Sequence, residues 1–300
     1  MGKTIFQASG YRYIDNESGA AIEAYFPDEA GLGRSCLAVK YGLIRDEAFE
    51  IQTDITRAVS STEDAYLRLH LLSQRQIQPN QANLEGLFTH LVNVAWTSAG
   101  PVLPHLVSQL RSRVAADYHH LVVFAVDKFP RMLDYVVPQG IRVADGDRVR
   151  LGAHLAEGTT VMHEGFINFN AGTLGTCMVE GRITPGVTVG DGSDVGAGSS
   201  IMGVMSGGGK SVNAIGRGSL LGANAGIGIS LGDACIVEAG LYVTAGTKVR
   251  MKDGSVEYAR NLSGRNNLLF RRNSQTGAVE ALPTDTSVWG GVNTTLHSND

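Results

Sequence analysis

Apolar residues recur at every sixth position through the middle of the chain. The series runs from residue 137 to 179, slips by four residues, and continues from 183 to 201. After a longer interruption it returns from 215 to 227, and a second slip of four precedes the last run, from 231 to 249. The members are Val137, Val143, Val149, Leu155, Val161, Ile167, Thr173, Val179, Ile183, Val189, Val195, Ile201, Ile215, Leu221, Ile227, Leu231, Val237, Val243 and Val249. A sustained period of six is typical of the hexapeptide repeat of a parallel β-helix.

The residues around each apolar position fit the same interpretation. The position two before it is small at Ala153, Thr159, Gly165, Ala171, Cys177, Ser193 and Ser199. The 38 glycines of the chain crowd into residues 140–246, where tight turns between short strands need backbone conformations that glycine reaches freely. Collagen needs glycine at every third position, and a flexible linker would not hold apolar residues in phase. The pattern therefore predicts a mainly β fold whose three-hexad coils are triangular.

The segments outside the repeat have other patterns. Helical spacing of apolar residues predicts a helix over 63–76 and further helices over 84–94 and 102–114. Apolar runs at 36–39 and 121–126 predict strands. We expect an N-terminal α/β or α+β domain that covers one end of the β-helix.

These patterns divide the chain into three parts. The N-terminal α/β domain takes residues 1–132, the β-helix takes 133–250, and a small C-terminal segment takes 251–300. The end of that segment is polar, and we expect it to be disordered.

Composition limits the compartment and the partners. A net charge of -4 argues against nucleic acid as the main partner. The three cysteines are widely spaced, with no CxxC pair, so we expect reduced thiols and no disulfide. The sequence has no apolar leader and no apolar run near the roughly 20 residues that cross a bilayer. We expect a cytoplasmic protein that binds no membrane.

Several stretches are more specific than the six-residue period. The most specific are Met-Val-Glu-Gly-Arg at 178–182 and Asn-Leu-Leu-Phe-Arg-Arg at 267–272. Others are His-Glu-Gly-Phe-Ile-Asn at 163–168, Gly-Thr-Leu-Gly at 172–175 and Leu-Gly-Ala-Asn-Ala-Gly at 221–226. Together they resemble the tetrahydrodipicolinate N-succinyltransferase family in its actinobacterial-type form. The resemblance is dense over residues 130–275 and loose over the N-terminal part.

The resemblance implies a fold, an assembly and a reaction. It implies that the β-helix is left-handed and that three chains form a homotrimer with active sites between neighbouring β-helices. Succinyl-CoA would donate its succinyl group to the amine of ring-opened tetrahydrodipicolinate, L-2-amino-6-oxopimelate. The products would be N-succinyl-2-amino-6-oxopimelate and CoA, in diaminopimelate and lysine biosynthesis.

Glu180 and Arg182 match the family's central site residues. The resemblance makes Glu180 the catalytic carboxylate, as a general base or as the carrier of the acyl group in an anhydride. Glu180 lies where the period slips by four, so a local bulge or loop would push it off the regular wall. The resemblance makes Arg182 an acyl-CoA contact, and an arginine can pair with a carboxylate in a bidentate way. The alternative interpretation is that both are solvated surface residues.

The resemblance carries further acyl-CoA contacts onto the later coils. They are Ala197, Ser200, Ala223, Glu238, Ala239, Gly246, Tyr258 and Arg271. Most are small, which suits a pantetheine arm lying against the β-helix, although simple coil packing explains small residues equally well. Tyr258 departs from the family, where relatives can have a lysine, and Lys248, Lys252 or Arg260 could replace that cation.

Asp147 and Glu164 match positions that hold Mg²⁺ near the trimer axis in the family. Copies of one carboxylate around an axis would repel without a cation, so a divalent ion is reasonable. The alternative is that both are solvated turn acids.

Other functions remain as alternatives. One is a related N-acyltransferase that uses acetyl-CoA or another amine, and another is a non-catalytic trimeric β-helix scaffold.

Residues 206–211 resemble a phosphate-binding loop, but the first glycine of that motif is not at the required spacing. We expect a mobile loop over the active site instead. His154 and His163 are the histidines of the repeat, one fewer than a zinc site with three histidines needs.

Overall fold

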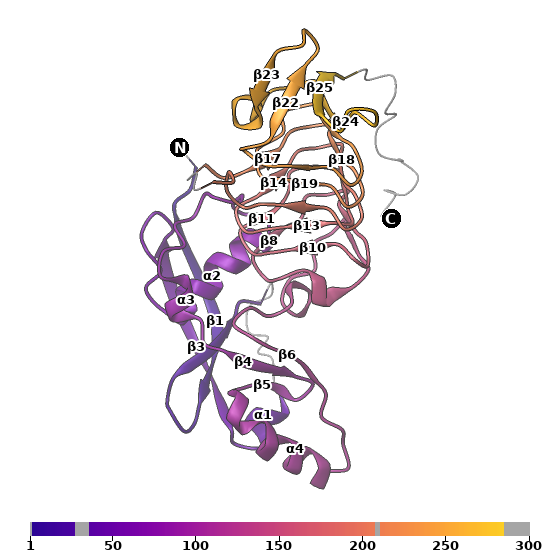
Figure 1. The fold of residues 1–300 in the computed structure, drawn as a ribbon. Coiled ribbons are helices and arrows are strands. Elements are labelled where there is room, and N and C mark those ends of the chain that lie inside the picture. Colours follow the sequence, from indigo (N-terminus) through magenta and orange to yellow (C-terminus); the bar gives the residue numbers. More distant parts are fainter. Residues whose placement is uncertain (1, 28–35, 208–210, 285–300) are drawn as a thin grey trace. The chain divides into compact units, whose positions relative to one another are not determined.

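The computed structural model describes residues 2–27, 36–207 and 211–284 (Figure 1). The expected loop at 206–211 lies partly, and the expected disorder of the C-terminal end largely, outside the described residues. None of the helices in the described ranges is both long and apolar enough to cross a membrane.

The chain divides into two compact units. Unit 1 comprises Met1–Leu71 and Gln81–Val136, and unit 2 comprises Leu72–Asn80 and Val137–Asp300. The short segment Leu72–Asn80 therefore belongs to the unit that holds the repeat. The boundaries predicted at residues 132 and 250 remain predictions.

Unit 1 combines two antiparallel sheets with short helices. The first sheet has the order β2-β1-β3 and the second the order β5-β4-β6. The strands are β1 (Ile5–Asp15), β2 (Ala21–Tyr25), β3 (Ile44–Asp54), β4 (Val94–Thr97), β5 (Gly100–Val102) and β6 (Val123–Asp127). The helices are α1 (Leu37–Lys40), α2 (Thr62–Ser73, whose last two residues fall in unit 2), α3 (Leu87–His90), η1 (Pro104–Leu106), α4 (Val107–Ala116) and η2 (Met132–Asp134). Because the sheets are antiparallel, the unit has the α+β rather than the α/β form.

The predicted elements of unit 1 are partly wrong. The run at 36–39 is no strand, because Leu37–Lys40 forms α1, which Gly42 ends with a φ of 67°. Four apolar residues in a row fit a buried strand and a buried helical turn equally well. The predicted helix over 84–94 is reduced to the four residues of α3, since strand β4 already begins at Val94. The helix predicted over 63–76 is confirmed as α2.

Unit 2 is a parallel β-helix with three faces. Two are the parallel sheets β10-β13-β16-β19-β21 and β8-β11-β14-β17, and the third runs from β7 through β9, β12, β15 and β18 to β20. The strands are β7 (Arg142–Val143), β8 (Ala153–His154), β9 (Thr160–Val161), β10 (Phe166–Ile167), β11 (Ala171–Thr173), β12 (Cys177–Val179), β13 (Arg182–Ile183), β14 (Thr188–Val189), β15 (Ser193–Val195), β16 (Ser200–Ile201), β17 (Ala214–Ile215), β18 (Leu220–Leu221), β19 (Gly226–Ile227), β20 (Ile236–Val237) and β21 (Tyr242–Val243). Figure 1 shows these strands stacked in layers along the unit.

The period of six is confirmed as the interior of this stack. Val161, Ile183, Val195 and Val237 are all fully buried. Val137 was a wrong member of the series, because its side chain is 73% exposed. The parallel pairing begins only at β7, so no coil encloses Val137.

Several of the small residues that lie two positions before an apolar residue of the repeat also form hydrogen bonds. Thr159, Cys177, Ser193, Ser219 and Cys235, which we name the donor column, are buried, and each donates to a backbone carbonyl of the next coil. The bonds are Thr159 Oγ1 to Gly175 O at 3.4 Å, Cys177 Sγ to Gly190 O at 3.2 Å, Ser193 Oγ to Gly216 O at 2.7 Å, Ser219 Oγ to Gly232 O at 2.9 Å and Cys235 Sγ to Arg265 O at 3.2 Å. These positions therefore require a donor as well as a small volume.

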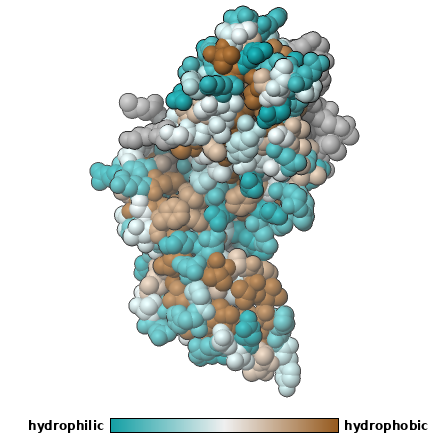
Figure 2. All heavy atoms as spheres, viewed as in Figure 1, coloured by the Kyte–Doolittle hydropathy of each residue, from teal (hydrophilic) through white to brown (hydrophobic). Residues whose placement is uncertain are grey.

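The C-terminal segment ends the stack with antiparallel strands. Strand β24 pairs with β20 and turns back as β25. The remaining elements are η3 (Gly146–Arg148), β22 (Lys248–Met251), β23 (Val256–Tyr258), η4 (Ala259–Leu262), β24 (Leu268–Arg272) and β25 (Val279–Pro283). Figure 2 shows hydrophilic residues over much of this end of the unit.

Candidate active site

A short corner of the coil, between β12 and β13, holds Glu180. The backbone N–H groups of Glu180 and Gly181 both donate to the carbonyl of Val195, at 2.8 and 3.1 Å. Only Glu180 and Gly181 lie between strands β12 and β13, whereas four residues, 196–199, lie between β15 and β16 of the next coil, and this shorter corner explains why the period falls from six to four. A Cβ at position 181 would lie 2.2 Å from Ser199 Oγ, so glycine is required there. The slip predicts a local bulge or loop, and the structure shows a short corner between strands whose register is regular.

Arg182 follows on the next face of the coil. It opens strand β13, where its side chain is exposed while that of Ile183 is buried. We name the sheet β10-β13-β16-β19-β21 the Arg182 face. Its outward residues, which pair in register from coil to coil, are Phe166, Arg182, Ser200, Gly226 and Tyr242.

The charged groups of Glu180 and Arg182 are available to a ligand. Glu180 is half-buried and Arg182 is exposed. Within residues 2–27, 36–207 and 211–284, neither side chain forms a hydrogen bond or an ion pair. Two opposite charges two residues apart are thus left for partners outside the chain.

Three of the predicted small residues stack on the corner above Glu180. We name Ala197, Ala223 and Ala239 the alanine corner, and all three are exposed. Backbone hydrogen bonds link the corner from coil to coil, from Gly198 N to Glu180 O at 3.4 Å, Asn224 N to Ala197 O at 2.8 Å and Gly240 N to Ala223 O at 2.8 Å. The structure therefore brings the alanine corner, Glu180, Arg182 and Ser200 together along one edge of the Arg182 face.

Glu238 and Arg271 are occupied by partners within the chain. The carboxylate of Glu238 accepts a hydrogen bond from the backbone N–H of Arg272 at 2.7 Å. The guanidinium of Arg271 pairs with Glu280 at 3.1 Å. Both interactions fasten the C-terminal strands, so any contact of these two residues with a ligand would have to coexist with them.

The remaining predicted contacts lie toward the other edge of the Arg182 face. Gly246 is exposed in the turn after β21. Tyr258 pairs in register with Lys248, and the guanidinium of Arg260 lies 5.0 Å from the centre of its ring. Lys252 is exposed in the turn that joins β22 and β23. Two of the three cations that could replace a lysine at position 258 therefore lie beside Tyr258.

The residues around Asp147 and Glu164 do not form a metal site in one chain. The carboxylate of Glu164 lies 3.2 Å from Arg148 and 3.0 Å from His163, so cationic partners already engage it. No group of three or more His, Cys, Asp or Glu side chains suited to a metal ion is found in the part of the chain that the structure describes. Mg²⁺ does not fit the donor set of a single chain.

The two histidines of the repeat differ in their surroundings. His154 is buried on the face formed by β8, β11, β14 and β17, with Nδ1 3.0 Å from the carbonyl of Thr173. Burial is the main cause that lowers the pKa of His154. His163 is exposed beside Glu164. His154 is therefore a structural residue rather than a catalytic base.

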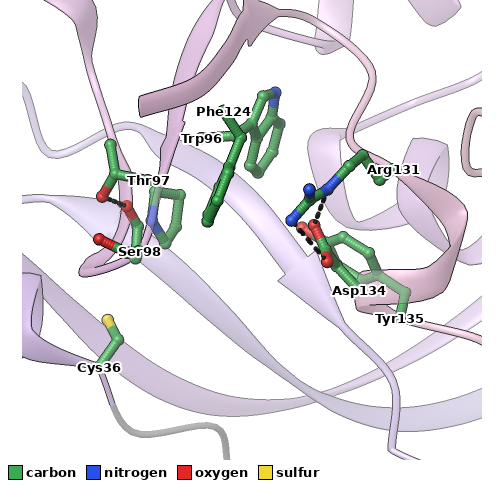
Figure 3. Close-up of a pocket in the computed structure, with 10 residues that line it drawn as sticks. Cys36, Trp96, Thr97, Ser98, Phe124, Arg131, Asp134 and Tyr135 are labelled. Carbon is green, nitrogen blue, oxygen red and sulfur yellow. Dashed lines mark hydrogen bonds and ion pairs between the residues drawn. The ribbon is translucent and has the colours of Figure 1, made fainter. Parts of the chain in front are cut away.

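A separate pocket lies within unit 1 and includes none of the predicted site residues. It has a volume of about 450 Å³, and Trp96, Phe124, Arg131 and Asp134 contribute to its wall (Figure 3). The guanidinium of Arg131 lies 4.2 Å from the centre of the Phe124 ring and pairs with Asp134 at 3.0 Å. Because the pocket's cation is already neutralised, we assign it no role in the reaction.

Two outward residues of the Arg182 face, Phe166 and Tyr242, were not among the sequence predictions. Each directly precedes a buried apolar residue of the repeat, as Arg182 precedes Ile183. In a strand, the residue before an inward one points outward. The residue before each apolar position was therefore the signal that could have identified this ladder.

Two family models match parts of the chain. The model described as "Tetrahydrodipicolinate N-succinyltransferase middle" matches residues 91–131 in unit 1. The model described as "Hexapeptide repeat of succinyl-transferase" matches residues 177–202 and 212–245, which hold Glu180, the alanine corner and the Arg182 face from β13 to β21.

Curated proteins and a solved structure are similar over most of the chain. The 2,3,4,5-tetrahydropyridine-2,6-dicarboxylate N-succinyltransferase of Vibrio cholerae is 58% identical over 247 residues, which cover 80% of this chain and 71% of that protein. The protein of the same name from Pseudomonas aeruginosa is 56% identical over 248 residues, covering 81% and 72%. The crystal structure of a putative 2,3,4,5-tetrahydropyridine-2-carboxylate N-succinyltransferase from Campylobacter jejuni superposes with a TM-score of 0.83 at 29% identity, covering 95% of this chain and 93% of that one.

Proposed function

This chain belongs to the tetrahydrodipicolinate N-succinyltransferase family and is an acyltransferase, and from that premise we propose that its reaction takes place at the corner around Glu180. It transfers the succinyl group of succinyl-CoA to the amine of tetrahydrodipicolinate, the succinylation step of diaminopimelate and lysine biosynthesis. The relatives come from Vibrio and Pseudomonas, so the actinobacterial-type form remains a prediction.

One observation carries the assignment of the site. Glu180 and Arg182 bear opposite charges, lie two residues apart, and have no side-chain partner among the residues that the structure describes. Other charged groups of the unit, such as Glu164 and Arg271, are paired. Two opposite charges without partners, beside the exposed alanine corner, are suited to substrate binding and proton transfer.

The chemistry assigns a role to each of the two charges. The acceptor nitrogen attacks the thioester carbonyl, the C–S bond breaks, and CoA leaves with the electron pair of that bond. The nitrogen must lose a proton in the process, and the carboxylate of Glu180 is placed to accept it as a general base. The anhydride route, in which Glu180 attacks the thioester first, is the alternative. The guanidinium of Arg182 would bind the free carboxylate of the succinyl group, which an acetyl donor lacks.

The alanine corner and Ser200 suit the arm of acyl-CoA. Successive coils are about 4.8 Å apart, so the Arg182 face from Arg182 to Tyr242 spans three steps, or roughly 14 Å. Small exposed side chains along that length let an extended arm approach the backbone. The cations Lys248 and Arg260 lie beyond it, where the phosphates of the nucleotide would need positive charge.

The assembly belongs to the same proposal. We infer a left-handed coil, a homotrimer with active sites between neighbouring β-helices, and a cytoplasmic location. A Mg²⁺ ion shared by carboxylates of several chains remains a prediction, since the donor set of one chain does not fit it, and no step of the reaction depends on it.

A thiol-release assay tests the reaction. We expect the purified protein to release CoA only when succinyl-CoA and tetrahydrodipicolinate are both present, and much faster than with acetyl-CoA. Release with acetyl-CoA alone as donor would favour the related acetyltransferase. No release with either donor from a folded protein would favour the non-catalytic scaffold.

Replacing Glu180 tests the site. Glu180→Gln and Glu180→Ala should lower kcat by about 10²-fold or more, because each removes the proton acceptor. The melting temperature and the assembly should stay unchanged, since the Glu180 side chain makes no hydrogen bond or ion pair within the described ranges. Glu157→Gln, at an exposed acid of the same unit, is the matched control and should remain active. An active Glu180→Ala protein would refute the mechanism and leave the fold untouched.

A further inference from the structure

The aromatic side chain at the end of the Arg182 face is left exposed at the surface. Tyr242 pairs in register with Gly226, and Gly226 pairs with Ser200. Tyr242 is 44% exposed. Across the described ranges of the chain, its side chain makes no hydrogen bond and no ring contact. A large apolar ring is thus kept at the surface on the ladder that also carries Arg182.

Gly226 holds the ring flat against the strand. A Cβ at position 226 would lie 2.0 Å from Cε2 of Tyr242 and 2.4 Å from both Cδ2 and Cζ. The backbone does not need glycine here, because Gly226 is not among the described residues with a positive φ. It lies in a regular parallel strand and donates to the carbonyl of Leu241 at 3.0 Å. The glycine therefore makes room for the Tyr242 ring.

The flat ring completes a surface with two distinct ends. Arg182 supplies a cation at one end, and the bare strand at Gly226 and the face of the Tyr242 ring supply an apolar plane at the other. Amide and methyl groups pack well on an aromatic face, whereas phosphates need cations. The ligand that fits is acidic at its tip and has a neutral arm behind it.

We propose that the Tyr242 ring is the platform on which the pantetheine arm of succinyl-CoA packs, and that Gly226 keeps the ring in that position. This inference rests on the proposed function, because it takes succinyl-CoA as the donor. It makes Tyr242 a binding residue that sets the course of the arm between Arg182 and the nucleotide.

Four variants test the platform. Tyr242→Ala should weaken the binding of succinyl-CoA, measured by calorimetry, about five- to tenfold and raise its KM by a similar factor, with the KM of tetrahydrodipicolinate little changed. Tyr242→Phe keeps the ring and should restore most of that affinity. Gly226→Ala should show the same loss as Tyr242→Ala, because the new Cβ pushes the ring away, and an exposed ring can swing out without unfolding the strand. The double variant should lose no more than Tyr242→Ala alone.

The controls separate this inference from its premise. Tyr118→Ala, at a tyrosine of unit 1 that is 98% exposed, should bind succinyl-CoA like the parent protein. A parent protein without succinyl-CoA turnover would refute the proposed function. An active parent together with full affinity in Tyr242→Ala would refute the platform alone. The platform would also be wrong if Tyr242→Ala lost as much affinity for adenosine 3′,5′-bisphosphate, or if it dissociated into monomers.

Discussion

At the scale of single residues, the two buried thiols serve as hydrogen-bond donors. Cys177 and Cys235 occupy positions of the donor column that Ser193 and Ser219 fill in other coils. Burial is the main cause that raises the pKa of Cys177 to about 12, and it also raises the pKa of Cys235. Thiols with raised pKa values stay protonated, which is the form that can donate.

This arrangement predicts which cysteines react. In the native protein at pH 8, Cys177 and Cys235 should resist a thiol reagent, because the thiolate is the reactive form and both sulfurs are buried. Cys36 is half-exposed and should be the first to react. Titration with an aromatic disulfide should count at most one thiol before unfolding and three afterwards. Rapid native modification of Cys177, located by mass spectrometry, would contradict this account.

The central site residues could be predicted from the sequence, but their neighbour Tyr242 could not. Glu180 and Arg182 lie in a specific motif at the point where the six-residue period slips, and both features can be recognised in the amino-acid sequence. The significance of Tyr242 depends on its ring lying across Gly226, sixteen residues earlier and in another coil. The six-residue period predicts that the residue at position 242 points outward, but it does not predict where its ring lies.

At the scale of elements, the donor column links one coil to the next. Ser219 Oγ donates to the carbonyl of Gly232 and accepts from the N–H of Cys235, both at 2.9 Å. One hydroxyl thus satisfies two buried backbone groups of the following coil. Removing it would leave both without a partner in a site that excludes water.

Replacing Ser219 should separate the effect of side-chain volume from the effect of hydrogen-bond donation. Ser219→Ala should lower the free energy of unfolding by about 2–3 kcal/mol, because two buried backbone groups lose their partner. Ser219→Cys should lose less, since Cys177 and Cys235 already fill this position in other coils. Ser211→Ala, at an exposed serine, is the control for urea unfolding curves. Equal stability of the Ala and Cys variants would mean that only volume matters at this position.

Helix α2 is fixed in unit 1 by a buried ion pair. Asp64 and Arg68 are 2% and 1% exposed, and Arg68 Nε lies 2.8 Å from Asp64 Oδ1. Burial alone raises the pKa of Asp64, but hydrogen bonds from Arg68, Thr53 and Ser60 outweigh it and hold that pKa below its usual value. A carboxyl with a depressed folded-state pKa stabilises the protein above its unfolded pKa of about 3.9, and this contribution is lost as the pH falls through the folded-state value.

Asp64 should therefore contribute to acid sensitivity. We expect Asp64→Asn to lower the free energy of unfolding at pH 7 by about 3–5 kcal/mol, because it leaves the charge of Arg68 buried and uncompensated. The variant should also lose part of the decrease in stability that the parent shows below about pH 4. Asp117→Asn, which breaks the exposed pair with Lys40, should change the stability far less, because solvent screens that pair. Urea titrations at pH 7 and pH 3.5 measure both effects, and parallel pH profiles for Asp64→Asn and its parent would contradict the assignment.

Elements were predictable where a pattern repeated and unpredictable where it did not. The β-helix strands follow from apolar residues that recur many times in one phase, so the error at Val137 affects only the edge of the series. The run at 36–39 occurs once, and its last three residues lie in α1, a helical turn after which Gly42 has a positive φ. A run of four apolar residues is too short to show a period, so it does not distinguish a strand from a helical turn.

At the scale of the whole molecule, a period in the sequence becomes a stack in space. Register partners lie one coil apart, such as Val179 with Val195 and Leu221 with Val237. A ligand that follows the Arg182 face therefore meets residues from successive coils, and Arg182, Ser200 and Tyr242 become neighbours although they are far apart in sequence. The sequence could predict this order along the stack, whereas the antiparallel end formed by β24 and β25 follows no period.

The coil-to-coil hydrogen bonds also determine how the backbone would exchange its amide protons with solvent. The side chain of Arg182 is exposed, yet its N–H donates to the carbonyl of Ser199 in the next coil at 2.9 Å, as Gly226 N–H does to Leu241. Deuterium uptake at such positions requires neighbouring coils to separate, so it depends on a residue's place in the stack more than on its distance from water. The exposed side chains that contact the substrate can change rotamer in nanoseconds. The backbone that carries them exchanges its amide protons only when neighbouring coils separate.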